Sequence, residues 1–274
     1  MKRIVILFFV LISLANGMPA FITHENDVMF DKDEYYTEGL QFTFFKNDYS
    51  FGVGEQAFTP KNVKSTNLIE NDRRYAGYSF LFFNKNTEDS AIGATLGLTG
   101  DISEADWVQL KFHELIDVNT VKGWHNQMPN KVLFMLNAMK EWEVYKTDNF
   151  AIIPNIFVNV GTPITRAIPS IEFRVGKNVD TTNINKINYP SLYKKIADYG
   201  YYFYVKAESD VILYNLFLTK SDIKKNPVIY ELNCGVVINY NKWYLKIYNM
   251  ILTKEYKEQT KGQRISGANI GYLF

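Results

Sequence analysis

Ala268-Asn269-Ile270-Gly271-Tyr272-Leu273-Phe274 is the stretch that decides the fold. Apolar or aromatic residues at even positions alternate with Asn269 and Gly271, which is the two-residue period of a β-strand. The sequence ends on the aromatic Phe274. A soluble β-sandwich gains nothing from such an ending, whereas a closed barrel needs a last strand that pairs with the first, because a bilayer leaves no strand edge unpaired. We therefore predict an all-β fold, an antiparallel transmembrane β-barrel.

The same alternation recurs upstream of the last strand. Over residues 228–240 the even positions are mostly apolar, whereas Glu231, Asn233 and Asn239 stand between them. Residues 91–98 and 168–176 repeat the scheme with small or polar residues on one face. The strands of a soluble β-sandwich also alternate apolar and polar residues. Each of these segments therefore favours the barrel only when it is considered together with the last strand and the export signal.

We expect about twelve strands. Their predicted ranges are 21–29, 36–46, 50–58, 74–84, 89–98, 130–142, 149–160, 166–177, 200–216, 228–240, 243–256 and 265–274. An even number places both ends in the periplasm and the longer loops outside. Residues 178–199, rich in Asn, Lys and Thr, are long for an inner turn, so the count is least secure there.

The amino-terminal residues have the pattern of a secretory signal peptide. Met1-Lys2-Arg3 precedes the apolar run Ile4 to Leu14, and the small residues Ala15 and Gly17 follow. The run is short against the roughly 20 residues that a membrane-spanning helix needs, which argues against an anchor. We expect cleavage after Gly17 or after Ala20, so that the signal peptide is 1–17 and the barrel is 18–274.

The composition excludes several classes of protein and partner. With 30 basic and 29 acidic residues, nothing marks a nucleic-acid partner. Cys234 is the single cysteine, so the exported chain holds no internal disulfide. No stretch after the signal approaches 18 uninterrupted apolar residues, which excludes a helical membrane protein.

One short helix is expected, in the outer loop 99–129. Ser103 can cap it, Asp106 sits in its first turn, and Trp107 to Ile116 continue without Gly or Pro. Gln109 and His113 are four residues apart and therefore share one face of this helix.

Further polar residues fall on the same outer rim. Asn26 and Asp27 stand at the outer end of the first strand, and Thr37 begins the second strand across the first loop. Imidazole, amide, carboxylate and hydroxyl groups are those that hydrolysis requires. The alternative is that His113 is a solvated side chain in an ordinary polar loop.

Several motifs resemble, in order, the lipid A 3′-O-deacylase family of outer-membrane enzymes. These motifs are Glu25-Asn26-Asp27, Tyr36-Thr37-Glu38-Gly39, Phe58-Thr59-Pro60, Asp72-Arg73-Arg74-Tyr75-Ala76-Gly77, Gln109 to His113, and Lys122-Gly123-Trp124-His125-Asn126-Gln127. The similarity is dense from residue 25 to about residue 130, and beyond that only the barrel pattern is shared.

The resemblance implies a twelve-stranded barrel whose active site lies between the wall and a rim helix and faces the outer leaflet. It implies an enzyme that needs Ca²⁺ and removes the 3′-linked acyloxyacyl chain from lipid A in lipopolysaccharide. Asn26, Asp27, Thr37, Gln109 and His113 stand where the family keeps its functional residues.

Other positions match less clearly. A family lysine corresponds to Lys61 or to Lys64, and we assign both to substrate binding together with Tyr36. An acidic residue of the family is replaced here by Asn119, which puts full activity in doubt.

We expect ester hydrolysis without an acyl-enzyme. His113 acts as the base on a water held by Gln109 or Thr37, and Asn26 and Asp27 hold calcium. Thr37 as a covalent nucleophile is the less favoured variant, because a Thr hydroxyl needs strong activation.

The competing hypothesis is a passive pore or adhesin in the same membrane. Large candidates for inward positions such as Phe157 and Arg174 favour a filled barrel instead. As partners we expect the lipopolysaccharide substrate, outer-membrane lipid and the barrel assembly machinery, and we expect a monomer.

Overall fold

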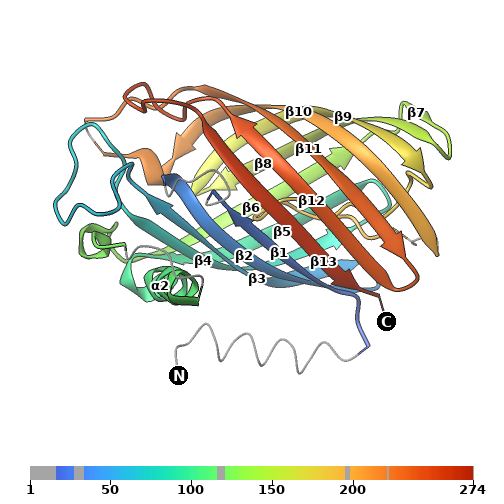
Figure 1. Cartoon of the computed structure of the whole chain (residues 1–274), viewed down its shortest axis with the longest axis horizontal. Helices are drawn as coiled ribbons and strands as arrows, with labels where there is room; N and C mark the ends of the chain where they lie inside the picture. The colour runs from blue at the N-terminus through green and yellow to red at the C-terminus, as the bar shows by residue number, and fades with distance from the viewer. Residues whose placement is uncertain (1–16, 28–33, 116–120, 195–197, 221, 274) are drawn as a thin grey trace.

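The structure is a computed structural model that describes residues 17–27, 34–115, 121–194, 198–220 and 222–273. Its strands form one closed antiparallel barrel, as Figure 1 shows. They are β1 (Ala20–Asn26), β2 (Tyr35–Lys46), β3 (Tyr49–Thr59), β4 (Ala76–Asn86), β5 (Ser90–Thr99), β6 (Lys131–Glu141), β7 (Tyr145–Lys146), β8 (Phe150–Gly161), β9 (Ile164–Lys177), β10 (Tyr199–Asn215), β11 (Val228–Tyr240), β12 (Trp243–Leu252) and β13 (Gln263–Tyr272). Among the described residues, no helix has the length and apolar character needed to cross a membrane.

The barrel closes between its first and last strands. β1 pairs with β13 along its whole length, from Ala20 opposite Tyr272 to Asn26 opposite Ser266. β7 is a short strand that pairs with β8 beyond the end of β6, so the labelled strands amount to twelve barrel strands. The predicted class, closure and strand number are confirmed. Phe274 and the predicted signal peptide up to residue 16 lie outside the described residues.

Most predicted strand ends agree with the structure to within two residues. The prediction was wrong for 243–256, because β12 ends at Leu252 and the next residues join the β10–β11 loop. Thr253 exchanges hydrogen bonds with Tyr230 of β11, and Lys225 of the β10–β11 loop forms an isolated bridge with Tyr256. The predicted strand 21–29 is seen as Ala20–Asn26, and residues 28–29 are outside the described part.

The alternation predicted for β11 is confirmed, with its apolar face turned outward. Tyr230, Leu232 and Ile238 are exposed on the outer surface, whereas Glu231 and Asn239 are buried inside. This is the reverse of a soluble protein and suits a wall between lipid and a polar interior. At the end of the barrel where the strands are joined by short turns, the ring of Trp243 packs edge-on against the ring of Tyr272. Trp and Tyr side chains are common at membrane–water interfaces.

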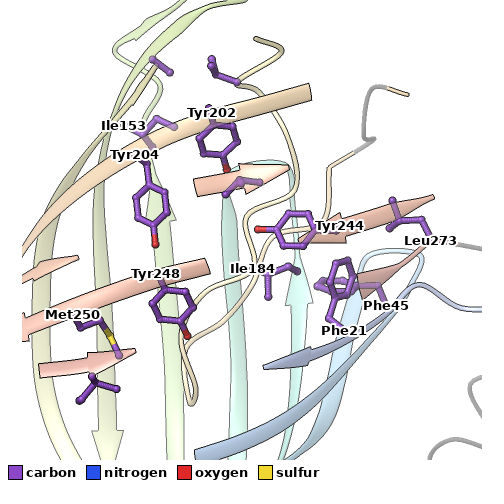
Figure 2. Packing of buried hydrophobic residues seen from close by; sticks show 14 of the residues in the cluster. Phe21, Phe45, Ile153, Ile184, Tyr202, Tyr204, Tyr244, Tyr248, Met250 and Leu273 are labelled. Carbon is purple, nitrogen blue, oxygen red and sulfur yellow. The ribbon is translucent and has the colours of Figure 1, made fainter. Parts of the chain in front are cut away.

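Residues 178–194, between β9 and β10, enter the lumen and are called the lumen plug here. Lys246 Nζ donates to Ile184 O at 2.9 Å, and Asn188 N–H donates to Gln41 Oε1 at 2.9 Å. Figure 2 shows Ile184 among the aromatic side chains of the wall. The segment predicted as an awkward inner turn therefore leaves the strand count intact and fills the barrel.

Charged side chains tie the plug to the wall. Lys186 Nζ lies 2.5 Å from a carboxylate oxygen of both Glu208 and Glu231, on the inner faces of β10 and β11. The inward positions predicted for Phe157 and Arg174 are also seen. Phe157 packs on Tyr189 of the plug with ring centroids 4.5 Å apart, and Arg174 donates to Val179 O.

Candidate active site

Helix α2 (Ala105–Leu115) lies against the outer face of β3 and β4 (Figure 1). The short 3₁₀ helix η2 (Asp101–Ser103) precedes it, and Glu104 between them has φ 57°. Ser103 was predicted as the helix cap, but it is the last residue of η2. Its hydroxyl donates to Gly100 O at 2.7 Å and accepts from the N–H of Ala105 at 3.4 Å. A left-handed residue, Glu104, thus separates η2 from helix α2.

A glycine on β4 allows this close approach. A Cβ at Gly77 would lie 2.3 Å from Ser103 Oγ and 2.6 Å from Ala105 Cβ, which no ordinary packing permits. Next to it on the same face, Ser79 Oγ donates to Ser103 O at 2.5 Å. The start of the helix is therefore held directly on the barrel wall.

Gln109 joins the helix to the wall. Its side chain is 0% exposed, and its Nε2 donates to Thr37 Oγ1 at 2.9 Å. Its Oε1 accepts from Trp124 Nε1, also at 2.9 Å. Thr37 Oγ1 in turn donates to Ala57 O at 3.2 Å. Both ends of the Gln109 amide are engaged, so its orientation is fixed.

Thr37 owes its position to an irregularity in β2. The register between β2 and β3 shifts between Tyr36 and Glu38, as in a β-bulge. Tyr36 consequently points into the lumen, where its hydroxyl donates to Glu25 Oε2 at 2.6 Å. Thr37 meets helix α2 on the outer side. The structure therefore does not bring Tyr36 together with Gln109 and Thr37.

Asn26 and Asp27 lie at the same height of the barrel wall as Thr37. Asn26 is the last residue of β1 and stands opposite Glu38 of β2, next to Thr37. Asp27 is buried, and its Oδ2 accepts from the N–H of Glu34 at 2.7 Å. No cluster of three or more His, Cys, Asp or Glu side chains suited to a metal occurs in the described ranges. Amide and carboxylate oxygens alone fit a hard cation such as Ca²⁺ rather than zinc.

His113 lies one helical turn after Gln109 on the same face and is 2% exposed. This burial speaks against the solvated-histidine alternative. Lys61 and Lys64 are exposed in the β3–β4 loop. Among the described residues, neither lysine side chain forms a hydrogen bond or ion pair with Gln109 or Thr37, and the backbone N–H groups of the two lysines donate to Asp72 and Asn62. Asn119 is outside the described residues.

The sequence did not predict two side chains of the site, Trp124 and Glu55. Trp124, in the 3₁₀ helix η3 (Trp124–Asn126), is buried against the ring of Tyr75 and orients Gln109. Trp124 belongs to one of the motifs quoted above, but nothing in the sequence indicates that its indole N–H pairs with Gln109. Glu55 of β3 is buried on the outer face near Glu38. Gly54 and Gln56 flank Glu55 in the strand, so no contrast of apolar and polar neighbours indicates its face.

A family model and a solved structure match this chain over nearly its whole length. The model of the family described as "Outer membrane protein LpxR" matches residues 4–274. The solved structure "LpxR from Salmonella typhimurium" superposes with a TM-score of 0.79 at 16% identity, covering 93% of this chain and 100% of that one. The β domain of the Bordetella autotransporter BrkA is matched with a TM-score of 0.40 at 10% identity, over 94% of this chain and 99% of that one. A comparison with curated protein sequences finds no match.

Proposed function

The chain belongs to the LpxR family of outer membrane proteins, and from that premise we propose that it is a lipid A deacylase. Its substrate is the lipid A part of lipopolysaccharide, and the bond hydrolysed is the ester of the 3′-linked acyloxyacyl chain. The active site is the group formed by Thr37, Gln109 and His113 between the wall and helix α2, facing the outer leaflet.

The hydrogen bond between Gln109 and Thr37 is the observation that carries this proposal. It belongs to a buried polar cluster on the side of the wall that otherwise presents apolar residues to lipid. Placing such a cluster there is costly unless its groups are hydrogen-bonded. A helix seated on the wall encloses it, so a lipid ester can reach polar groups away from bulk water.

In the mechanism we propose, His113 is the general base. It takes a proton from a water molecule positioned by Gln109 on the same helical face, and the resulting hydroxide attacks the acyl carbonyl. When the tetrahedral intermediate collapses, the bond to the sugar oxygen breaks and His113 returns the proton to that oxygen. Thr37 already donates to Ala57 O and accepts from Gln109, which suits a positioning group better than a covalent nucleophile.

Calcium is part of the proposal. Asn26 and Asp27 would hold the ion, and when bound it supplies polarisation of the ester carbonyl and stabilisation of the oxyanion. Asp27 is kept in place by the N–H of Glu34, so its carboxylate is oriented in advance.

The passive pore is the competing function, and the lumen plug argues against it. Lys186, Asn188 and Ile184 occupy the lumen and contact several wall strands. An adhesin binds through exposed residues, so adhesion does not explain a buried histidine and a buried glutamine under the rim helix. The enzyme hypothesis also includes insertion by the barrel assembly machinery, contact with outer-membrane lipid and a monomeric state.

Mass spectrometry of lipid A tests the function. Cells that express the protein should contain lipid A lighter by one acyloxyacyl chain, and cells without it should not. Expression of Gln109→Ala, with matched amounts of folded barrel, should lower the fraction of deacylated lipid A. Unchanged lipid A in cells with folded wild-type protein would contradict the proposed activity.

A further inference from the structure

Two buried carboxylates lie on the outer face of the barrel next to the candidate active site. Glu38 of β2 and Glu55 of β3 are each 2% exposed. Their neighbours in the two strands face the lumen, since a Cβ at Gly39 would meet the Tyr36 hydroxyl and Gln56 lines a lumen cavity together with Tyr36. Alternation along each strand therefore directs Glu38 and Glu55 outward. We call these two residues the outer carboxylate pair.

The strand register places the two side chains within reach of each other. Glu38 stands opposite Ala57 of β3, and Glu55 lies two residues from Ala57 on the same face. Such diagonal neighbours on adjacent strands lie roughly 7–8 Å apart, a distance that two long side chains can bridge. Burying two carboxylates together on a lipid-facing wall is costly unless a group of opposite charge joins them.

The protein itself supplies no such group to Glu55. Among the described residues, neither carboxylate oxygen of Glu55 has a hydrogen-bond partner. The residues opposite it in the adjacent strands are Leu40 and Ser79, and both are uncharged. Lys111 of helix α2 is exposed and pairs with Glu114 of the same helix. The charge of the outer carboxylate pair is therefore left for a ligand to balance.

The ligand that fits the outer carboxylate pair is a bare divalent cation that prefers oxygen, of which Ca²⁺ is the best match. Two carboxylates offer up to about four oxygens, and water can complete the coordination shell of Ca²⁺. Zinc prefers nitrogen and sulfur ligands, whereas the pair presents oxygens alone. An ammonium group carried on a lipid would need an open path to side chains that are almost fully enclosed. A single shared proton would neutralise only one of the two charges.

We propose that Glu38 and Glu55 bind a calcium ion beside helix α2, at a site separate from the one proposed at Asp27. The described carboxylates of Asp27, Glu38 and Glu55 do not form one group of three metal ligands, so a single ion cannot join them. The inference goes beyond the proposed function, because this ion would link β2 to β3 beneath the helix and take no part in hydrolysis. Ser79, opposite Glu55, already holds Ser103 before the helix begins.

The test is equilibrium dialysis of radioactive calcium against the full-length barrel in detergent, in the Asp27→Ala background so that the proposed active-site ion does not contribute. This protein should still bind calcium, and adding Glu38→Gln or Glu55→Gln should weaken the binding about tenfold or more, because each removes a charged ligand. Glu114→Gln, an exposed carboxylate of helix α2, is the matched control and should leave the binding unchanged. The heat-modifiable gel shift shows that each variant is folded.

Unchanged calcium binding after Glu55→Gln would overturn the inference. An Asp27→Ala protein that binds no calcium would also overturn it, because the outer carboxylate pair would then share a proton only. Should Glu55→Gln fail to fold, Glu38→Gln decides the same question. These outcomes do not depend on catalysis. If wild-type protein failed to hydrolyse lipid A while Glu55→Gln still abolished calcium binding, the proposed function would fail and the cation site would stand.

Discussion

Gln109 has no freedom to reorient under the rim helix, since Thr37 and Trp124 engage both ends of its amide. A buried amide with one end unpaired would be costly, so the three residues stabilise one arrangement together. His113, one turn further along the helix, is positioned by the same contacts because the helix is rigid between them. The proposed base is thus fixed relative to the wall.

His113→Ala should lower turnover by about 10²- to 10⁴-fold, which is the usual contribution of a placed general base. Only neutral imidazole accepts a proton, so wild-type turnover should fall as the pH is lowered from neutral to acid. Gln109→Ala should lower turnover less and leave this pH dependence in place. Initial rates on purified lipid A measure both effects, with the heat-modifiable gel shift as the control for folding. Nearly silent substitutions at both positions would mean that neither side chain takes part in catalysis.

Asp27 gives a prediction about metal removal. A chelator should abolish deacylation, and calcium should restore it better than magnesium, because a site built from carboxylate, amide and carbonyl oxygens suits a large cation of flexible coordination. Asp27→Ala should shift the calcium dependence to higher concentrations without affecting the barrel. Activity assays across a calcium titration provide the measurement. Full activity in excess chelator would remove the metal from the mechanism.

Counting strand positions placed Asn26, Asp27 and Thr37 correctly at the outer rim, but it could not place Tyr36. Strict alternation puts Tyr36 and Glu38 on one face, yet the bulge between them turns Tyr36 to the lumen and Glu38 outward. A bulge depends on the neighbouring strand, so the local pattern alone does not reveal it. The assignment of Lys61 or Lys64 to substrate binding stays a prediction.

At the scale of elements, the strands were predictable because each one must show apolar residues to lipid and polar residues to the lumen. The last strand is the clearest case, since Ile270 is exposed and Asn269 is buried as alternation requires. The path of 178–194 could not be predicted in the same way. Its partners Gln41 and Lys246 lie in strands far away in the sequence, and the segment has no periodicity of its own.

The packing of helix α2 on β4 gives a prediction at the scale of elements. Gly77→Ala should displace the helix, because the new Cβ would overlap Ser103 and Ala105, and Gly77→Val should displace it further. A shift of about 1 Å in a catalytic group can lower turnover about 100-fold. Leu81→Ala, on the same outer face of β4 but exposed to lipid, is the control. Turnover should fall in the order wild type, Gly77→Ala, Gly77→Val, while the barrel still inserts into membranes.

At the scale of the whole molecule, the barrel separates two environments that serve different purposes. The outer face carries the proposed chemistry where lipid arrives, and the lumen is closed by the plug. Lys186 balances Glu208 and Glu231 inside, so removing the plug also removes the charge that pairs these carboxylates. Neighbouring wall pairs such as Lys206 with Glu208 and Arg174 with Glu172 remain.

Replacing residues 180–194 by a short Gly-Ser turn should therefore convert a closed barrel into a water-filled one. The wall strands satisfy their own backbone hydrogen bonds, so the barrel should persist, and its polar inner face would be wetted. Wild-type protein in planar bilayers should be electrically silent, whereas the variant should conduct ions steadily and admit small polar solutes into liposomes. Ile92→Ala, a change on the lipid-facing surface, should stay silent like the wild type. A silent variant would mean that wall side chains alone fill the lumen, and steady conduction by the wild type would restore the pore hypothesis.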